Sequence, residues 1–273
     1  MTPRLRHRRA ARGFSLIEVA IGMVILGLSA AGLVMVLNKQ AEQRRFVETR
    51  GTLGQARDAL LAYVAANGRL PCPALAGTGG QESRVAPNNP QCTANIGFLP
   101  AVTLGLPNLD PNGLLNDGWA DGAGTNNGTF LRALRYSVTP LAGGVTNALT
   151  AAGLGNPTLA GRQAVQAAFV ANEGLFVCRS SAGLAGAGNR CGGAANTLST
   201  NAAAAVWSQG LNGSSLANWS ADELQNANQV VPRVVISREN APPGAQGGEF
   251  DDLVTWLPYP LVVDRLLNAG HVQ

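Results

Sequence analysis

An apolar run from Phe14 to Leu37 is the clearest pattern of polarity in this chain, and it contains one charged residue, Glu18. Such a run is long enough for a membrane-spanning helix, which needs about 20 residues. A carboxylate at the centre of such a helix costs about 2.5–3.5 kcal/mol on insertion scales. We therefore expect Glu18 to have a function that a leucine in its place could not fulfil.

A short basic leader precedes the apolar run and predicts its orientation. The leader contains no acidic residue, and its arginines are Arg4, Arg6, Arg8, Arg9 and Arg12. Because positively charged flanks stay on the cytoplasmic side, we expect residues 1–13 to remain in the cytoplasm and the rest of the chain to cross the membrane. An ordinary secretory signal fits poorly, since its apolar core has about 7–15 residues and is followed by the cleavage site.

The helical pattern continues beyond the apolar run. Residues 39–57 are mostly polar and contain no proline, and Asn67-Gly68 gives a stop signal. One apolar stripe at helical spacing is formed by Leu53, Leu60, Leu61 and Val64. A helix from Phe14 to about Ala66 would be about 80 Å long at 1.5 Å per residue. We expect residues 14–37 to form its membrane half and residues 38–67 its amphipathic half.

Residues 68–273 have the pattern of a mixed head with short strands. β-branched or aromatic runs flanked by turn residues predict strands at 134–139, 174–178, 204–208 and 231–237. A capping-box pattern at Ser220–Glu223 predicts a short helix, and 261–269 predicts a final one. Segments 140–161 and 180–201 lack apolar density and are interpreted as surface loops. The predicted fold class is α+β, with an antiparallel sheet packed on the second half of the long helix.

Composition favours a secreted body of low charge. Of the 273 residues, 13% are charged, and the length allows one ordinary domain beyond the anchor. Removing the five leader arginines from the formal net charge of +4 leaves about −1 for the mature side chains. Net charge therefore gives no support to nucleic-acid binding.

Four cysteines, Cys72, Cys92, Cys178 and Cys191, would face an oxidising compartment. They allow three connectivities, of which the nearest-neighbour pairs are favoured because each closes a short loop-like segment. A zinc site is disfavoured, since Cys-x-x-Cys does not occur and the only histidines, His7 and His271, lie near the chain ends.

The sequence Gly-Phe-Ser-Leu-Ile-Glu at 13–18, followed by an apolar helix, resembles the N-terminus of type IV pilins and type II secretion pseudopilins. In that family a membrane peptidase cuts after the glycine and methylates the new amino terminus. The resemblance implies cleavage between Gly13 and Phe14 and an N-methylphenylalanine at Phe14. It also implies that Glu18 pairs with the terminal amine of a neighbouring subunit in a helical filament.

Motifs in the head resemble a subgroup of large pilin-like proteins. The matching segments are Leu70-Pro71-Cys72-Pro73, Gly97-Phe98-Leu99-Pro100, Asp117-Gly118-Trp119 and Leu134-Arg135-Tyr136. The chain departs from that pattern at Ala101, where an aromatic residue is expected, and at 120–130, which reads as an inserted loop rich in glycine and asparagine.

Three acids near the C-terminus raise the question of a metal. Glu249, Asp251 and Asp252 follow two glycines and could gather around calcium, which takes six to eight oxygen ligands. Some pseudopilins carry calcium in a C-terminal loop of this general kind. A solvated turn before a strand is the favoured interpretation, so no metal or other cofactor is assigned. Asp251 and Asp252 are also unsuited to paired acid catalysis if they lie on a strand, where neighbours point to opposite faces.

The resemblance implies a minor pilin or pseudopilin, a structural subunit of a type IV pilus or a type II secretion pseudopilus. Its partners would be prepilin peptidase, other subunits through the N-terminal helix, and an inner-membrane assembly platform. The chain would cross the inner membrane once, with the head in the periplasm and later in a filament or at the cell surface.

Two other classes of function remain open. The head could be a membrane-anchored recognition module for a surface, a secretion substrate or DNA, which would need a groove formed by Arg132, Arg135, Arg179 and Arg190. A membrane-anchored enzyme is the other alternative. It is disfavoured because no Gly-x-Ser-x-Gly or phosphate-loop motif occurs and, without the leader, His271 is the only histidine.

Overall fold

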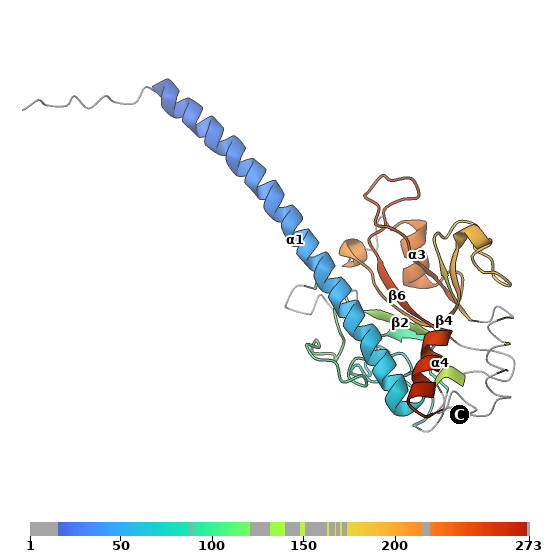
Figure 1. Ribbon diagram of the computed structural model, residues 1–273. Helices are drawn as coiled ribbons and strands as arrows, with labels where there is room; N and C mark the ends of the chain where they lie inside the picture. Colours follow the sequence, from blue (N-terminus) through green and yellow to red (C-terminus); the bar gives the residue numbers. More distant parts are fainter. Residues whose placement is uncertain are drawn as a thin grey trace, which may run out of the picture. The chain divides into compact units, whose positions relative to one another are not determined.

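The computed structural model of the chain is drawn in Figure 1. It describes residues 16–87, 89, 91–120, 132–139, 148–150, 163, 167, 170, 174–214 and 219–271. The chain divides into two compact units, Met1–Arg44 and Arg45–Gln273. The leader at 1–13 and the predicted cleavage site between Gly13 and Phe14 lie outside the described residues.

Helix α1, Leu16–Asn67, begins in the first unit and ends in the second. It ends where the sequence predicts, because Gly68 adopts a left-handed conformation with φ 65° and donates its N–H to the carbonyl of Val64 at 2.8 Å. A left-handed residue after the last turn satisfies a carbonyl that the helix itself leaves unpaired. Across the described stretches of the chain, no helix reaches both the length and the apolarity that a membrane span requires.

The head contains a six-stranded sheet among its described residues. Its strands are β1 (Ile96–Phe98), β2 (Arg135–Val138), β3 (Leu175–Cys178), β4 (Thr197–Ser208), β5 (Val234–Ile236) and β6 (Leu253–Pro258). The order is β1-β2-β4-β3-β5, and β6 also pairs with β4. All pairs are antiparallel except β3 with β5, so the sheet is mixed within the predicted α+β class.

Strand β4 is the centre of this sheet. Ala202 pairs with both Leu175 of β3 and Pro258 of β6, which places β3 and β6 on opposite edges of β4. Strand β2 pairs with β4 over the same stretch as β6, so β2 and β3 share one edge. The other edge of β4 is occupied by β6.

The two faces of β4 pack into two apolar clusters. Ala204 and Val206 are fully buried in a cluster that also holds Leu60 and Val64 of α1. Trp207 faces the opposite way and belongs to a cluster with residues of β3 and β5. This alternation is what a pleated strand buried on both faces requires. The predicted apolar stripe of α1 is buried throughout, with exposures of 7% or less at Leu53, Leu60, Leu61 and Val64.

The remaining elements cover the sheet and close the loops. Helices α3, Ala221–Asn228, and α4, Tyr259–Asn268, form where the sequence predicts them. Ser220 is the N-cap of α3, and α4 buries Val262 and Leu266 in the apolar cluster that holds Leu60 and Val64 of α1. Among the described residues, short 3-10 turns lie at Ala148–Thr150, Ala194–Asn196 and Leu211–Ser214. The prediction of a loop over 180–201 is wrong at its end, since Thr197–Asn201 forms the first part of β4.

The Asp117-Gly118-Trp119 segment docks on α1. Thr49 donates to the carbonyl of Arg45 and accepts from the N–H of Gly118, at 2.8 and 2.9 Å. A Cβ at Gly118 would lie 2.5 Å from the carbonyl oxygen of Arg45, so only glycine permits this approach. Trp119 then packs edge-on against Phe46, with ring centroids 6.3 Å apart. The motif therefore anchors a loop to the helix.

Both disulfides join nearest neighbours, Cys72 with Cys92 and Cys178 with Cys191, which is the pairing that the sequence favours. Each closes a short loop, with sequence separations of 20 and 13 residues. By loop-entropy arguments a bridge of this size contributes about 3 kcal/mol. The second bridge joins an irregular segment to β3 through Cys178, whereas the first joins two irregular segments to each other.

Glu82 anchors the first disulfide loop from inside. Its carboxylate accepts from Arg69 at 2.8 and 2.9 Å and from the N–H of Cys72 at 3.0 Å, and Arg84 lies 3.2 Å away. Burial alone would raise the pKa of Glu82, but the hydrogen bonds from Arg69 and Cys72 and the attraction of both arginines outweigh it, so the pKa is lowered. The ionised form of Glu82 is thus the one that the fold stabilises.

We predict that Glu82→Gln destabilises the head by about 1–3 kcal/mol at neutral pH, because charge-assisted hydrogen bonds to partly buried groups are lost. A lowered folded pKa means that this stabilisation is present above the ordinary glutamate pKa and is lost as pH falls through the folded pKa. The difference in Tm between wild type and variant should therefore shrink in strongly acidic buffer. Thermal unfolding followed by circular dichroism measures it.

Glu42→Gln is the matched control for this prediction. Glu42 pairs with Lys39 at 3.2 Å on an exposed helix surface, with side-chain exposures of 47% and 84%. Exposed pairs of this kind contribute little, so its Tm should stay near that of the wild type. Equal effects of the two substitutions would contradict the role assigned to Glu82.

Candidate functional site

Glu18 lies in the first turn of α1 and is exposed. A carboxylate is favourable there because the N-terminal end of a helix carries partial positive charge. Gly13 and Phe14, the other two predicted residues of this site, lie outside the described residues. The structure therefore shows where Glu18 lies on the helix, and its pairing with the amine of Phe14 stays a prediction.

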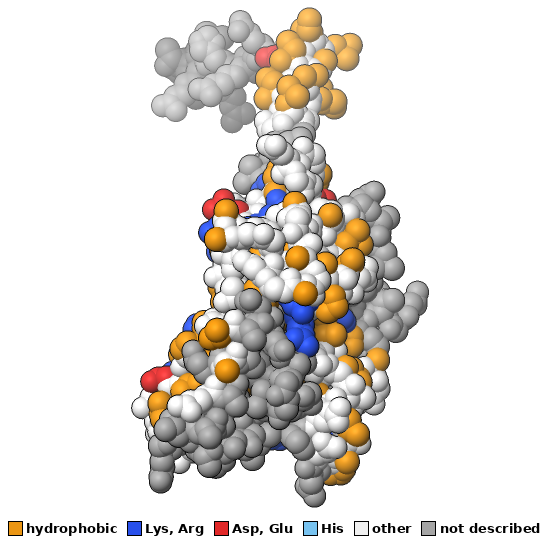
Figure 2. All heavy atoms as spheres, turned by 90° about the vertical axis from the view of Figure 1, so that its right-hand side faces the viewer, with side chains coloured by type: hydrophobic (Ala, Val, Ile, Leu, Met, Phe, Trp, Pro, Cys, Tyr) orange, Lys and Arg blue, Asp and Glu red, His pale blue; other side chains and the backbone are white. Residues whose placement is uncertain are grey.

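Exposed apolar side chains surround Glu18 on the same helix. They occur at consecutive positions on all sides, with exposures between 44% and 91% at Leu16, Ile17, Val19, Ile21, Met23, Val24, Ile25, Leu26 and Leu28. Figure 2 shows hydrophobic side chains gathered around the first turns of α1. A helix that is apolar all round is buried by something in its working state. This part of α1 thus has the surface of a helix that contacts lipid or other apolar helices.

A second group of charged residues lies in the head, where three carboxylates meet. One ligand oxygen from each of Glu223, Asp251 and Asp252 lies within 4.8 Å of the others. Glu223 occupies the third position of α3, while Asp251 and Asp252 directly precede β6. Glu223 and Asp252 are 2% and 4% exposed. Carboxylates this close and this buried repel one another strongly unless protons or a cation balance them.

Hydrogen bonds hold the three carboxylates in place. Glu223 accepts from Ser220 N–H at 2.8 Å, completing the capping box, and from the side-chain amide of Asn212 at 3.0 Å. Asp251 accepts from the N–H of Asn212 at 2.9 Å through Oδ2, while its buried Oδ1 has no hydrogen-bond partner among the described residues. Asp252 accepts from the buried amide of Asn226 at 2.7 Å.

The electrostatics of this cluster favour protonated carboxyls. Burial, together with the charges of Glu223 and Glu249, raises the pKa of Asp251 to about 7. Burial and the neighbouring carboxylates raise the pKa of Asp252 well above its usual range, against the opposing effect of the hydrogen bond from Asn226. Oxygen ligands of this kind suit calcium, although three carboxylates are fewer than the six to eight oxygens that it takes.

Two of these three residues, Asp251 and Asp252, are calcium candidates of the sequence analysis. The third candidate, Glu249, does not belong to the cluster of carboxylates, and Glu223 occupies that place. The capping-box pattern signals that Glu223 is structurally important, but it cannot show that α3 lies beside the start of β6. The expectation that Asp251 and Asp252 point to opposite faces assumed that both lie on a strand, and that assumption does not hold, because strand β6 begins only at Leu253.

The arginines of the predicted recognition groove act mainly as structural donors. Arg132 donates to the carbonyls of Gly210 and Leu211, and Arg190 donates to those of Gly186 and Pro232. Arg135 is largely buried and stacks over the ring of Phe98 at 4.8 Å. Arg179 is exposed. Arg132 and Arg190 therefore donate to different loops, and the groove that the four arginines would form stays a prediction.

Residues 8–34 match the family described as the prokaryotic N-terminal methylation motif. This range contains Gly13, Phe14 and Glu18, and it supports a type IV pilin-like protein that is structural rather than enzymatic. The motif implies processing by prepilin peptidase and assembly with other pilins. No curated protein and no solved structure matches the chain significantly.

We predict that the free energy of unfolding falls as pH rises from about 4 to about 7, measured with a chelator present. The pKa of Asp117 is raised to about 6, chiefly by burial, and that of Asp251 to about 7, both from a usual value of 3.8. In this window the native state holds protons that the unfolded chain has lost, so higher pH favours unfolding. Asp251→Asn should reduce the fall in free energy of unfolding across this window by about 1–2 kcal/mol after allowance for solvent screening.

Asp264→Asn is the control for the pH profile, since Asp264 is exposed on α4 and bonds only to Asn268 among the contacts described, at 3.2 Å. It should leave the slope of stability against pH unchanged. An Asp251→Asn variant that keeps the full wild-type slope would show that Asp251 does not titrate in this window.

Proposed function

We propose that this chain is a minor pilin or pseudopilin, assembled into a type IV pilus or a type II secretion pseudopilus. The observation that carries the proposal is the methylation motif at 8–34, in which Glu18 lies on a helix whose apolar side chains are exposed. Both features are explained together if the helix packs among the corresponding helices of other subunits. Neither is needed by a protein that works alone in water.

Processing is the first step of the proposed function. Prepilin peptidase hydrolyses the peptide bond between Gly13 and Phe14 on the cytoplasmic side, and a methyl group is transferred to the new amine of Phe14. The residue retains a positive charge at its nitrogen after methylation. Before assembly, the chain is anchored in the inner membrane with its head in the periplasm.

The assembly step uses that amine and Glu18. In an apolar surround, opposite charges attract strongly, and each relieves the desolvation cost of the other only when both are present. A subunit that enters in the wrong register leaves Glu18 unpaired, so the pair sets the register between neighbouring helices. The inner-membrane assembly platform would hold the subunits while this pairing forms.

A minor or specialised position is supported by the size of the head. It extends from residue 68 to the C-terminus, and its irregular segments are held by two disulfides. Loops that protrude from a head hinder repeated lateral packing, whereas a subunit present in few copies or at a tip tolerates them. The recognition function remains the second candidate, and it concerns the head alone.

We predict that Glu18→Ala is made, cleaved and methylated but is depleted about tenfold or more from filaments, because its neighbour's amine is left unpaired. Intact mass of the membrane-extracted protein, expressed in its own host, should show loss of residues 1–13 and gain of one methyl group. Immunoblots of sheared filaments measure incorporation. Glu42→Ala is the control, since Glu42 is an exposed acid on the same helix.

Normal incorporation of Glu18→Ala would refute the register mechanism, whereas absence of the cleaved wild-type protein from filaments would favour a membrane-anchored protein that never polymerises. An uncleaved wild-type chain, or a cut after the apolar run, would refute the pilin assignment itself.

A further inference from the structure

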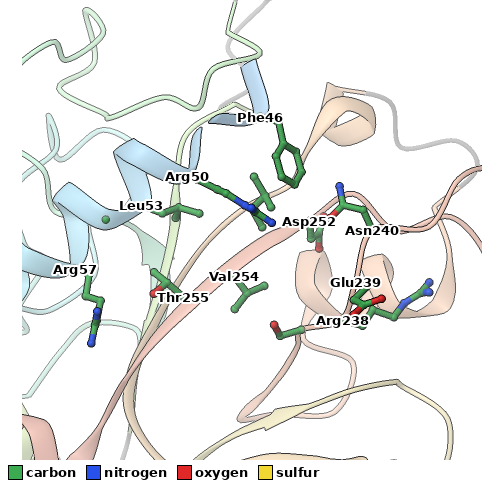
Figure 3. Close-up of a pocket in the computed structure, with 13 residues that line it drawn as sticks. Phe46, Arg50, Leu53, Arg57, Arg238, Glu239, Asn240, Asp252, Val254 and Thr255 are labelled. Atoms are coloured by element: carbon green, nitrogen blue, oxygen red, sulfur yellow. The ribbon is translucent and has the colours of Figure 1, made fainter. Parts of the chain in front are cut away.

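A groove of about 490 Å³ lies within the second unit, beside the start of β6. One wall is formed by α1 from Phe46 to Arg57, and the others by the segments 237–240 and 252–255 (Figure 3). Side chains alternate between faces along a strand, yet the consecutive residues Leu253, Val254 and Thr255 all line the groove. The groove therefore runs along the edge of β6 and not over one face of the sheet.

That edge of β6 is open in the described part of the chain. Strand β6 pairs with β4 on one side, and no described strand pairs with its other side. Val254 and Thr255 are partly exposed there. An unpaired strand edge presents a row of backbone donors and acceptors, and an extended peptide can satisfy them by adding a strand. The geometry of the groove thus suits an extended segment.

The helical wall of the groove carries positive charge that the described residues leave uncompensated. Arg50 and Arg57 are seven residues apart and so lie on one side of α1, separated by about 10 Å along the axis. Neither forms an ion pair with a described residue. Arg50 stacks on the ring of Phe46 at 4.5 Å, and the buried Nε of Arg57 has no hydrogen-bond partner in the described chain. A buried donor without a partner is unfavourable, and an acceptor on a ligand would satisfy it.

The opposite wall offsets only part of this positive charge. Arg238 lies 2.8 Å from Asp222, so its charge is compensated. Asp252 is buried and accepts a hydrogen bond from the side-chain amide of Asn226 at 2.7 Å. Glu239 is exposed at the rim. Charge in the groove is therefore dominated by the two arginines of α1.

We propose that this groove binds an extended acidic peptide segment of a partner protein, which adds a strand to the open edge of β6 and places its carboxylates at Arg50 and Arg57. Residues on one face of an extended strand recur at about 7 Å for i and i+2 and about 13 Å for i and i+4. Either spacing brings two acidic side chains within reach of the two guanidinium groups. This interaction is independent of Glu18 and of the proposed filament function.

The test uses the full chain in detergent and fluorescent peptides of about six residues, the length of an ordinary strand. One set has glutamates at i and i+2 or at i and i+4 between valines, a second has lysines in their place, and a third keeps the glutamates but has a central proline. Fluorescence anisotropy measures affinity. We expect an acidic peptide to bind about tenfold or more tightly than its lysine and proline counterparts, because both charge and strand pairing contribute.

Variants locate the binding site. Arg50→Gln with Arg57→Gln should weaken binding of the acidic peptide about tenfold and reduce its salt dependence. Arg265→Gln, an exposed arginine on α4 outside the groove, should have no effect. Hydrogen exchange should slow at residues 253–258 when the acidic peptide is present. Glu18→Ala should bind the peptide normally, which separates this result from the filament assay.

Several outcomes would overturn the proposal. These are failure of every acidic peptide to bind, equal binding of the lysine peptides, affinity unchanged by the double substitution, or exchange at β6 unchanged by peptide. If the wild type self-associates and the double substitution abolishes this, then a second copy of the chain occupies the groove and the proposed occupant is wrong.

Discussion

The packing of the second half of α1 against β4 is the contact on which the rest of the head depends. Leu60 and Val64 are fully buried with Ala204 and Val206 in one apolar cluster, so the helix packs against the strand at the density of a protein interior. Small side chains on β4 let the helix approach, and enlarging Ala204 would cost about 1–3 kcal/mol through overpacking. Because β2 and β6 pair with the two edges of this same stretch, its position fixes both flanks of the sheet.

A chain with few charges uses several of its ionisable groups inside the fold. Glu82, in the loop closed by Cys72 and Cys92, forms ion pairs with Arg69 and Arg84. Asp222 of α3 forms an ion pair with Arg238. The cluster of Glu223, Asp251 and Asp252 differs, since like charges meet there and two of the carboxyls have raised pKa values. The first two groups stabilise the head as ion pairs, whereas the third makes its stability depend on pH.

The two compact units carry different kinds of interaction surface. In Met1–Arg44 the described helix exposes apolar side chains around a single acid, which suits packing among similar helices. In Arg45–Gln273 the surface of interest is a polar groove with arginines beside an open strand edge. Apolar packing contributes affinity without direction, while strand pairing and charge provide specificity. A filament subunit that also recognises a partner needs both.

Features encoded by neighbouring residues could be predicted from the sequence. The motif around Glu18, the end of α1 at Asn67, the capping box of Ser220 and the buried stripe of α1 each depend on residues within a few turns of one another. Only the tertiary structure decided the strand character of Thr197–Asn201, the parallel pairing of β5 and the approach of Glu223 to Asp251. Alanine, serine and threonine in β4 give little periodic signal, and burial by distant segments determines their conformation. The physical reason is that contacts between residues far apart in the chain leave no local pattern.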